Sequence, residues 1–320
     1  MEILKLKPAF KDYLWGGRKL VEQYNKVCDY DKVSESWELS NHKDGSSIID
    51  NGSLKGETFR NYIENNSKEI WGTNCAKFEN FPILIKFIDA KQALSIQVHP
   101  DDEYALKNEG EYGKNEFWYI LDCEPGSFLY YGVKEPMTKE EYRARIENDT
   151  ICDYLNQVKV KKGDCFYIKA GTIHAIGAGI VICEIQQCSN STYRVYDFGR
   201  VGADGKPREL HIDKAVDVSD LTVSGKNGEA DGQLIDKGSY AETDLTHNDY
   251  FKCDKYDIKE SVTLKADETT FNSIIILDGN GTITYDGETL DFIKGDSFFV
   301  PANCGEYTIN GEASVIISYM

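Results

Sequence analysis

The stretch that decides the fold is LSIQVHPDDEYA, residues 94–105. Its first half alternates apolar and polar side chains, which is typical of a strand with one buried face. Side chains two apart in a strand point to the same face, so Gln97 and His99 are expected to lie side by side. The acidic residues that follow predict a helical turn and a loop. Two potential ligands therefore stand together at the end of one strand.

Three further stretches carry ligand-type residues on predicted strands. They are KNEFWYIL with Glu116, GDCFYIKAGTIHAIGAG with His174, and GIVICEIQQCS with Glu184 and Gln186. A carboxylate, two imidazoles and a side-chain amide are suitable ligands for a divalent transition metal. Because each comes from a different strand of a β-rich segment, the sequence predicts a metal site inside a β-barrel.

The charge balance argues against nucleic acid as a partner. The 320 residues contain 36 basic and 54 acidic side chains, a formal net charge of −18, without a long cluster of lysine or arginine. Nucleic-acid-binding proteins usually present such a basic cluster. An acidic protein that binds an anion needs a local basic pocket, so isolated basic residues within strands are of interest.

Lys86 in FPILIKFIDA is such a residue, because both faces of this predicted strand are otherwise apolar. A buried ammonium is unfavourable unless it meets an anion, a carboxylate or a water-filled cavity. The alternative is an edge lysine whose head reaches solvent.

The chain shows the features of a cytoplasmic protein. MEILKLKPAF lacks the apolar core of a signal peptide, and no run of about 18 apolar residues predicts a membrane span or a membrane partner. Its nine cysteines are scattered, without a CxxC pair. This usage favours reduced thiols over a disulfide framework. His42, in a polar turn, is expected at the surface, and the oligomeric state stays open.

Helical segments interrupt the strands at three places. Residues 53–77 have helical spacing and predict one or two short helices. Residues 134–157 predict a helical insertion, with a capping box at Thr138 and Glu141 and a second helix over 151–155. This insertion is a candidate lid over the site. Residues 200–250 are expected to form an extended connection with few core residues.

The second half of the chain repeats the pattern of the first. FNSIIILDGNGTITYDG and DFIKGDSFFVPANCGEY match the stretches around 116–132 and 158–174. Aligning Ile120-Leu121-Asp122 with Ile276-Leu277-Asp278, and Gly163-Asp164 with Gly295-Asp296, puts Asn272 opposite Glu116 and Glu306 opposite His174. The second copy therefore lacks the ligands. We expect a metal-binding catalytic barrel from residues 1–133 and 158–245, and a metal-free barrel from residues 246–320.

These motifs resemble those of a known superfamily. GDCFYIKAGTIH resembles the second cupin motif, and IQVHP followed by Glu116 resembles the first, with glutamine in place of the usual first histidine. Together with TYRVYD they resemble the short bacterial form of the type I phosphomannose isomerases, from Phe10 to the C-terminus. Lys169 departs from the usual proline. The resemblance implies a mainly β protein of two cupin-like jelly-roll barrels with a small helical insertion.

The resemblance also implies a set of metal ligands. They are Gln97, His99, Glu116 and His174, with one ion per chain. Zinc is the expected ion, although nitrogen and oxygen ligands would also suit iron, cobalt or manganese.

The implied activity is the interconversion of mannose 6-phosphate and fructose 6-phosphate through an enediol. By resemblance, Arg194, Lys114 and Glu184 are catalytic, and Lys86, Ser95 and Lys114 bind the sugar phosphate. Arg194 is expected to stabilise the enediolate. The sequence leaves the base open between Glu184, Lys114 and a metal-bound water, and an ion pair of Arg194 with Glu184 or Asp197 is the structural alternative for that arginine.

Two other functions are compatible with a cupin. A metal-dependent oxygenase or decarboxylase would usually have three histidines and a carboxylate, and the glutamine at 97 argues against it. A non-catalytic sugar-phosphate-binding or sensing cupin would not need Arg194 or Lys114.

Overall fold

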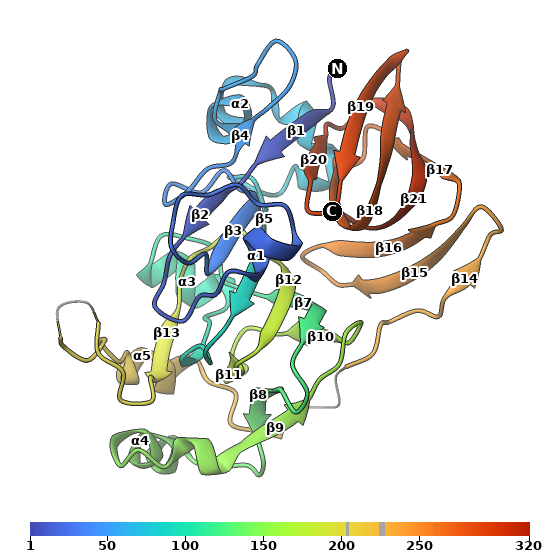
Figure 1. The fold of residues 1–320 in the computed structure, drawn as a ribbon. Coiled ribbons are helices and arrows are strands. Elements are labelled where there is room, and N and C mark those ends of the chain that lie inside the picture. The colour runs from blue at the N-terminus through green and yellow to red at the C-terminus, as the bar shows by residue number, and fades with distance from the viewer. Residues whose placement is uncertain (203–204, 224–227) are drawn as a thin grey trace.

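The computed structural model describes residues 1–202, 205–223 and 228–320. These residues form three antiparallel sheets with short helices around them (Figure 1). The helices are α1 (Lys19–Gln23), α2 (Phe59–Asn65), α3 (Asp102–Asn108), α4 (Lys139–Glu147) and α5 (Ile212–Val218), and the 3₁₀ helices are η1 (Lys68–Trp71), η2 (Thr73–Cys75) and η3 (Ile151–Tyr154). The mainly β fold and the short helices expected within 53–77 are confirmed.

Two of the sheets form the part of the chain that holds the ligand-type residues. The six-stranded sheet has the order β10 (Cys165–Ile168), β7 (Glu116–Cys123), β12 (Ile180–Gln187), β5 (Ile83–Ala90), β3 (Glu35–Leu39) and β2 (Ala9–Lys11). The five-stranded sheet has the order β13 (Tyr193–Tyr196), β6 (Ile96–Val98), β11 (His174–Ile176), β8 (Phe128–Val133) and β9 (Leu155–Lys159).

Strands β5 and β12 carry apolar residues on both faces because the six-stranded sheet has a hydrophobic core on each side. One face contributes Ile88 and Ile182 to a cluster with Leu129 and Ile176 of the opposite sheet. The other face packs in a second cluster that includes residues of the C-terminal half, such as Phe271. Both strands are buried along their whole length, so period-two alternation is absent from their sequences.

The third sheet contains ten strands and has its own core, which includes Ile274 and Val315. Its main order is β14 (Ile235–Asp236), β15 (Tyr240–His247), β16 (Lys252–Ile258), β21 (Gly305–Tyr319), β18 (Asn272–Tyr285), β20 (Ser297–Val300), β1 (Leu4–Lys7) and β4 (Ile48–Ile49). Two further strands pair at its side, β17 (Ser261–Ala266) with β21 and β19 (Glu288–Ile293) with β18.

The hydrogen bonding does not follow the domain boundaries expected from the sequence. Strand β1 pairs with β20 of the C-terminal sheet and with β4, so residues at both ends of the chain share one sheet. Strand β15 crosses the expected boundary at 245/246 and pairs with β16. Strand pairing thus joins segments on both sides of the expected boundaries. The assignment of two functional domains remains a prediction.

The internal repeat is visible in the main-chain hydrogen bonds. Gly163 N donates to Ile120 O (2.9 Å), and Gly295 N donates to Ile276 O (2.8 Å). Both glycines have positive φ, 92° and 91°, a conformation that favours glycine. The alignment that relates the two halves is confirmed, and it brings β7 with β10 and β18 with β20 into equivalent pairs.

The expected extended connection over 200–250 is wrong where α5, β14 and β15 form, although few of its described residues are buried, as expected. Helix α5 buries Ala215 and Val216, and strands β14 and β15 follow it. Its apolar positions are too few to give a clear periodic pattern. Residues 203–204 and 224–227 of this connection lie outside the described part of the chain.

The insertion contains the two expected helices, α4 and η3. The capping box between Thr138 and Glu141 is present. Tyr142 and Ile146 of α4 pack in a cluster with Ile96 and Val98 of β6. These β6 residues flank Gln97, so α4 covers the face of the sheet opposite to it. The action of this insertion as a lid remains a prediction.

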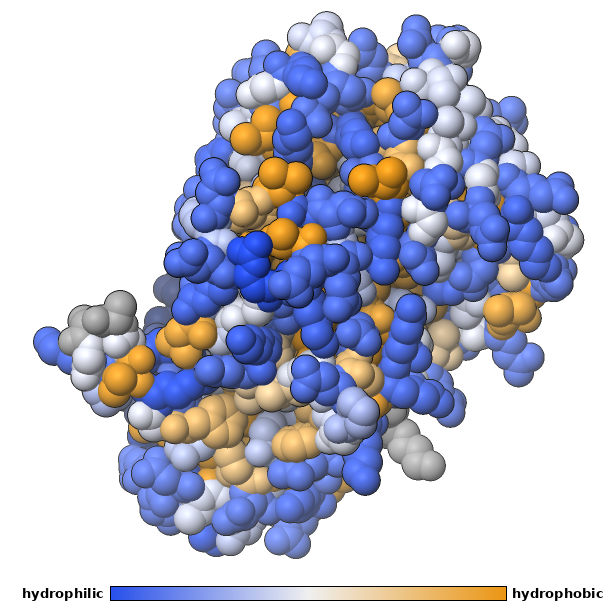
Figure 2. All heavy atoms as spheres, in the orientation of Figure 1, coloured by the Kyte–Doolittle hydropathy of each residue, from blue (hydrophilic) through white to orange (hydrophobic). Residues whose placement is uncertain are grey.

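The surface is mostly polar in the view of Figure 2, with apolar residues in small separate patches. None of the helices in the described ranges is long and apolar enough to cross a membrane. All nine cysteines are free thiols, as the sequence predicts.

Candidate active site

His99, Glu116 and His174 form a buried triad. His99 Nε2 lies 3.3 Å from Glu116 Oε1, and His174 Nε2 lies 3.6 Å from Glu116 Oε2. The three side chains offer ligand atoms within 4.8 Å of one another. The sequence therefore correctly predicts that these three residues meet.

Strand pairing brings the triad together. His174 of β11 lies opposite Gln97 of β6, and their side chains approach with Gln97 Nε2 and His174 Nε2 3.3 Å apart. His99 follows β6 directly, and Glu116 is the first residue of β7. Gln97 therefore lies beside the triad.

Both imidazoles present Nε2 to the centre of the triad. His99 Nδ1 lies 2.9 Å from Ser191 O, and His174 Nδ1 lies 2.8 Å from Thr172 O. Each carbonyl accepts a hydrogen bond from Nδ1, which leaves the Nε2 lone pair free for a metal. Burial, with Lys114 next in effect, lowers the pKa of His99. Burial and the neighbouring His99 lower the pKa of His174 to about 3, so both rings are neutral ligands.

The triad fits a divalent cation. Both carboxylate oxygens of Glu116 are buried and accept no hydrogen bond. Burial opposes the charge of Glu116, but Lys114 and His99 outweigh it, and its pKa lies well below the usual value. Lys114 Nζ lies 2.5 Å from Glu116 Oε1 and 3.3 Å from His99 Nε2. One carboxylate and two neutral imidazoles are a suitable donor set for a transition metal.

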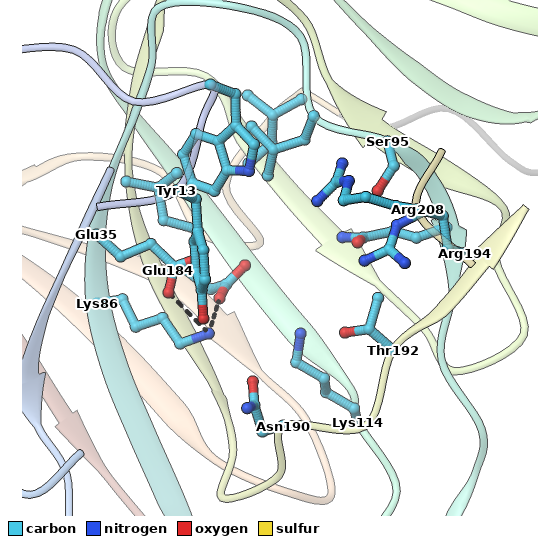
Figure 3. A pocket seen from close by; sticks show the side chains of 15 residues that line it. Tyr13, Glu35, Lys86, Ser95, Lys114, Glu184, Asn190, Thr192, Arg194 and Arg208 are labelled. Atoms are coloured by element: carbon cyan, nitrogen blue, oxygen red, sulfur yellow. Dashed lines mark ion pairs between the residues drawn. The ribbon is translucent and has the colours of Figure 1, made fainter. Parts of the chain in front are cut away.

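Next to the triad lies a cavity of about 290 Å³. Figure 3 shows the side chains that line this cavity. Gln97 and Lys114 contribute to its lining and also contact the triad. The other polar side chains of the lining come from both sheets and from the loops that connect their strands. A ligand in this cavity would therefore lie next to the triad.

One wall is a row of side chains across the six-stranded sheet. Glu184 of β12 lies between Lys86 of β5 and Trp118 of β7. Lys86 Nζ is 3.3 Å from Glu184 Oε1 and 3.8 Å from Glu35, and Trp118 Nε1 donates to Glu184 Oε2 (2.8 Å). Two carboxylates thus balance the buried charge of Lys86 at the edge of a cavity. A carboxylate partner and a cavity were two of the environments that the sequence analysis considered for this lysine.

The ion pair sets the protonation states of this row. Burial lowers the pKa of Lys86, but Glu35 and Glu184 outweigh it, so its pKa is raised and it remains an ammonium. Burial, followed by the charge of Glu116, raises the pKa of Glu184 above the usual value for a carboxyl.

The opposite wall carries Ser95, Arg194 and Arg208 (Figure 3). Arg194 lies opposite Gln97 in the pairing of β13 with β6. Its NH1 donates to Glu209 O (2.8 Å), and its buried Nε has no hydrogen-bond partner. The expected alternative, an ion pair of Arg194 with Glu184 or Asp197, is absent from the ion pairs of the described residues.

Asp197 instead binds two other arginines. Its carboxylate accepts hydrogen bonds from Arg208 Nε (2.7 Å) and from the guanidinium of Arg200. Arg200 also donates to Ala93 O (2.6 Å), two residues before Ser95. Asp197 therefore fixes Arg208 at the cavity and links it to the segment that leads into β6.

The lining also contains polar residues that the sequence did not single out, among them Tyr13, Glu35, Asn190 and Arg208. The first three belong to loops or to a strand without ligand-type spacing. Arg208 follows β13, within residues 200–250, which were expected to form an extended connection. Its positive charge is the only feature of the sequence there that indicates a role in the site. All the site residues expected from the sequence lie in the triad or in the cavity lining.

The expected surface position of His42 is wrong. His42 is 7% exposed and packs edge-on against Trp37, with Nε2 3.5 Å from Glu111 Oε1. The polar turn that suggested exposure folds back over the end of β3, so the ring is covered.

Comparison with known proteins gives a consistent result. Residues 3–119 match the catalytic domain of type I phosphomannose isomerase, and residues 241–320 match the cupin domain of mannose-6-phosphate isomerase. Mannose-6-phosphate isomerase ManA of Bacillus subtilis is 37% identical over 320 residues, which cover 100% of this chain and 99% of that protein. Mannose-6-phosphate isomerase of Streptococcus mutans is 36% identical over 319 residues, 99% of this chain and 98% of that protein.

A solved structure extends the likeness to three dimensions. The crystal structure of mannose 6-phosphate isomerase from B. subtilis aligns with a TM-score of 0.91 at 34% identity and covers 99% of both chains. The cupin-like fold and the resemblance drawn from the motifs are thereby confirmed. The chain belongs to the type I phosphomannose isomerase family.

Proposed function

We propose that this protein interconverts mannose 6-phosphate and fructose 6-phosphate. The observation that carries the proposal is the position of a buried His-Glu-His triad beside a polar cavity that contains both cationic and carboxylate side chains. An aldose–ketose shift needs a grip on the phosphate, a group that moves a proton, and stabilisation of an enediolate oxygen. The names of the relatives above agree with this reaction.

We propose Gln97, His99, Glu116 and His174 as the ligands of one zinc ion. The neutral imidazoles and the buried carboxylate of Glu116, which accepts no hydrogen bond, support this assignment. When bound, the ion supplies Lewis-acid polarisation of sugar oxygens. The ammonium of Lys114 lies among the same ligands. Because like charges repel, we infer that Lys114 turns toward the substrate in the metal-loaded protein.

The phosphate group is assigned to the wall of Ser95 and Arg208. A guanidinium binds phosphate with two parallel donors, and a serine hydroxyl adds a third. Lys86, expected from the sequence to hold the phosphate, already faces two carboxylates. Its charge therefore acts mainly on Glu184, and Lys114 is the better candidate for a second ammonium near the sugar.

The proton transfer is assigned to Glu184. Its Oε2 accepts a hydrogen bond from Trp118, whereas Oε1 has only the ion pair with Lys86, at 3.3 Å, and Glu184 lines the cavity. The raised pKa brings this carboxyl closer to the range of a general base. We propose that Oε1 carries the proton between C1 and C2, and that the guanidinium of Arg194 stabilises the enediolate.

Deuterium exchange tests this function. Mannose 6-phosphate incubated with the zinc-loaded protein in D₂O should give fructose 6-phosphate, with proton NMR showing deuterium at the carbon that receives the proton. Glu184→Gln should abolish both conversion and exchange while the folded protein still binds zinc. Binding of the sugar phosphate by the wild-type protein without conversion would instead favour a sensing cupin.

A further inference from the structure

Asn115 is a buried amide between two residues of the site, Lys114 and Glu116, and is 1% exposed. Side chains alternate along an extended chain, so Asn115 points to the other side from its two neighbours. Its main chain continues the pairing of β7 with β12, because Gln187 N donates to Asn115 O (3.1 Å). The hydrogen bonds of the Asn115 side chain therefore form behind the triad.

The side chain of Asn115 connects two segments. Its Oδ1 accepts from Ala170 N (2.9 Å), in the turn that leads to His174, and from Tyr167 OH (3.2 Å). Its Nδ2 donates to Gln187 Oε1 (2.7 Å), at the end of β12. The orientation of the amide is fixed, because only an oxygen can accept from the main-chain N–H of Ala170.

Gln187 extends the set of hydrogen bonds to a third segment. Its Oε1 also accepts from Asn115 N (3.0 Å), which fixes the orientation of this amide too. Its Nε2 donates to Asp102 Oδ1 (2.9 Å), and the same oxygen accepts from Gly113 N (2.7 Å). Asp102 begins α3, three residues after His99.

Close packing supports the same arrangement. A Cβ atom at Gly113 would lie 2.4 Å from the main chain of Asp101 and Asp102, so the chain before Glu116 rests directly on the start of α3. Main-chain hydrogen bonds run alongside, from Lys114 N to Pro100 O (3.0 Å) and from Gly171 N to His99 O (2.8 Å). The three segments that carry the triad are thus joined at their ends.

We propose that Asn115 and Gln187 are positioning residues of the metal centre. Their amides hold the segments of His99, Glu116 and His174 at the separation that one cation needs, without touching the cation or the cavity. This inference rests on the proposed metal site. Outer-shell hydrogen bonds of metal sites typically account for about 10- to 100-fold in metal affinity.

Gln187→Glu is the sharpest variant. Glutamate has almost the same shape and still accepts from Asn115, but its second oxygen faces the carboxylate of Asp102. Repulsion should push α3 and the His99 segment outward. We expect the dissociation constant for Co²⁺, measured by chelator competition, to rise about tenfold or more. The visible absorption band of bound Co²⁺, which reports its coordination geometry, should change as well.

Two further variants complete the test. Asp102→Asn combined with Gln187→Glu removes the repulsion between the two carboxylates, while the asparagine oxygen can still accept from Gly113 N, and should recover part of the affinity. Gln23→Glu, at an exposed position of α1, is the matched control and should leave Co²⁺ binding unchanged. If Gln187→Glu folds poorly, Gln187→Met removes the same hydrogen bonds without adding a charge and should weaken binding in the same direction.

The outcomes separate this inference from the proposed function. Unchanged Co²⁺ affinity and absorption in folded Gln187→Glu would overturn the inference, since a merely structural role lowers the unfolding temperature only. A double variant no better than Gln187→Glu would also contradict it. Failure of the wild-type protein to bind Co²⁺ through His174, judged with His174→Gln, would instead reject the proposed metal site.

Discussion

Glu116 keeps a negative charge in a fully buried position because its neighbours compensate for the loss of water. Lys114 and His99 hold the pKa of this carboxyl well below its usual value despite burial. The two histidines respond in the opposite way and stay neutral. A deprotonated carboxylate and two neutral rings can bind a divalent cation directly, because none of the three side chains must first release a proton.

The neutral state of His174 predicts a pH dependence of stability in the metal-free protein. Its pKa falls from 6.5 to about 3 on folding. Below about pH 6.5 the unfolded chain binds a proton that the folded chain does not. The free energy of unfolding therefore decreases as the pH is lowered, by up to about 1.4 kcal/mol per pH unit. This loss is absent at neutral pH and continues down to the folded pKa.

The measurement is urea unfolding of metal-free protein between about pH 6.5 and pH 5. His174→Gln should reduce the slope of stability against pH. Equal slopes for wild type and His174→Gln would contradict the buried neutral state of the ring.

Arg194 is predicted to act in the transition state. Arg194→Lys keeps the positive charge but loses the planar set of donors. We expect kcat to fall about 100- to 1,000-fold, as for the loss of one donor to an oxyanion, with a much smaller change in KM. Steady-state kinetics measure both, and Arg60→Lys on the surface of α2 is the control. A change confined to KM would assign Arg194 to substrate binding instead.

At the scale of single elements, the repeated turn at Gly163 and Gly295 offers a matched comparison. Both glycines have nearly the same positive φ, but their surroundings differ. A Cβ at Gly163 would approach only Tyr119 OH, at 3.9 Å, whereas a Cβ at Gly295 would lie 2.0 Å from Tyr24 O.

Alanine at the two positions should therefore have unequal effects. Gly163→Ala introduces only backbone strain and should cost about 1–2 kcal/mol of stability. Gly295→Ala adds a clash with main chain and should approach the about 4 kcal/mol of the most disruptive single substitutions. Denaturant unfolding compares the two variants. Equal losses would show that strain, not packing, dominates both turns.

The sequence predicted these elements well where a local pattern carries the information. The spacing of Gln97 and His99, the turn at Gly163-Asp164 and the capping box at Thr138 all follow from neighbouring residues, and the structure contains each. Arg208 and the buried position of His42 depend on where loops fold back, so no periodic pattern announces them.

At the scale of the whole molecule, a buried ion pair joins the six-stranded and ten-stranded sheets. Lys26 Nζ lies 2.7 Å from Glu38 on β3 and 2.5 Å from Gly295 O, next to β20. Ser36 Oγ donates to the same carboxylate (2.6 Å). Strand β1 joins the two ends of the chain at the same boundary. Neither link to the ten-stranded sheet was predicted, because Lys26 with Gly295 and β1 with β20 each join residues more than 250 positions apart in the sequence.

Lys26→Met should destabilise the protein by about 3–5 kcal/mol, because it leaves the Glu38 carboxylate buried without its partner. Burial raises the pKa of Glu38 even beside Lys26, and the loss of Lys26 should raise it further. The deficit is therefore present above the raised folded pKa and shrinks as pH falls through it. Unfolding in urea measures the loss, and replacing both partners by apolar residues should recover most of it.

The most direct test of the account is the metal dependence of sugar-phosphate isomerisation. A coupled assay measures fructose 6-phosphate formed from mannose 6-phosphate by the purified protein, after chelator dialysis, and after the addition of zinc. In the wild-type protein activity should disappear with the chelator and return with zinc, whereas in His174→Gln zinc should not restore it. Full activity in protein shown to be free of metal, or none in zinc-loaded protein that binds the sugar phosphate, would contradict the account.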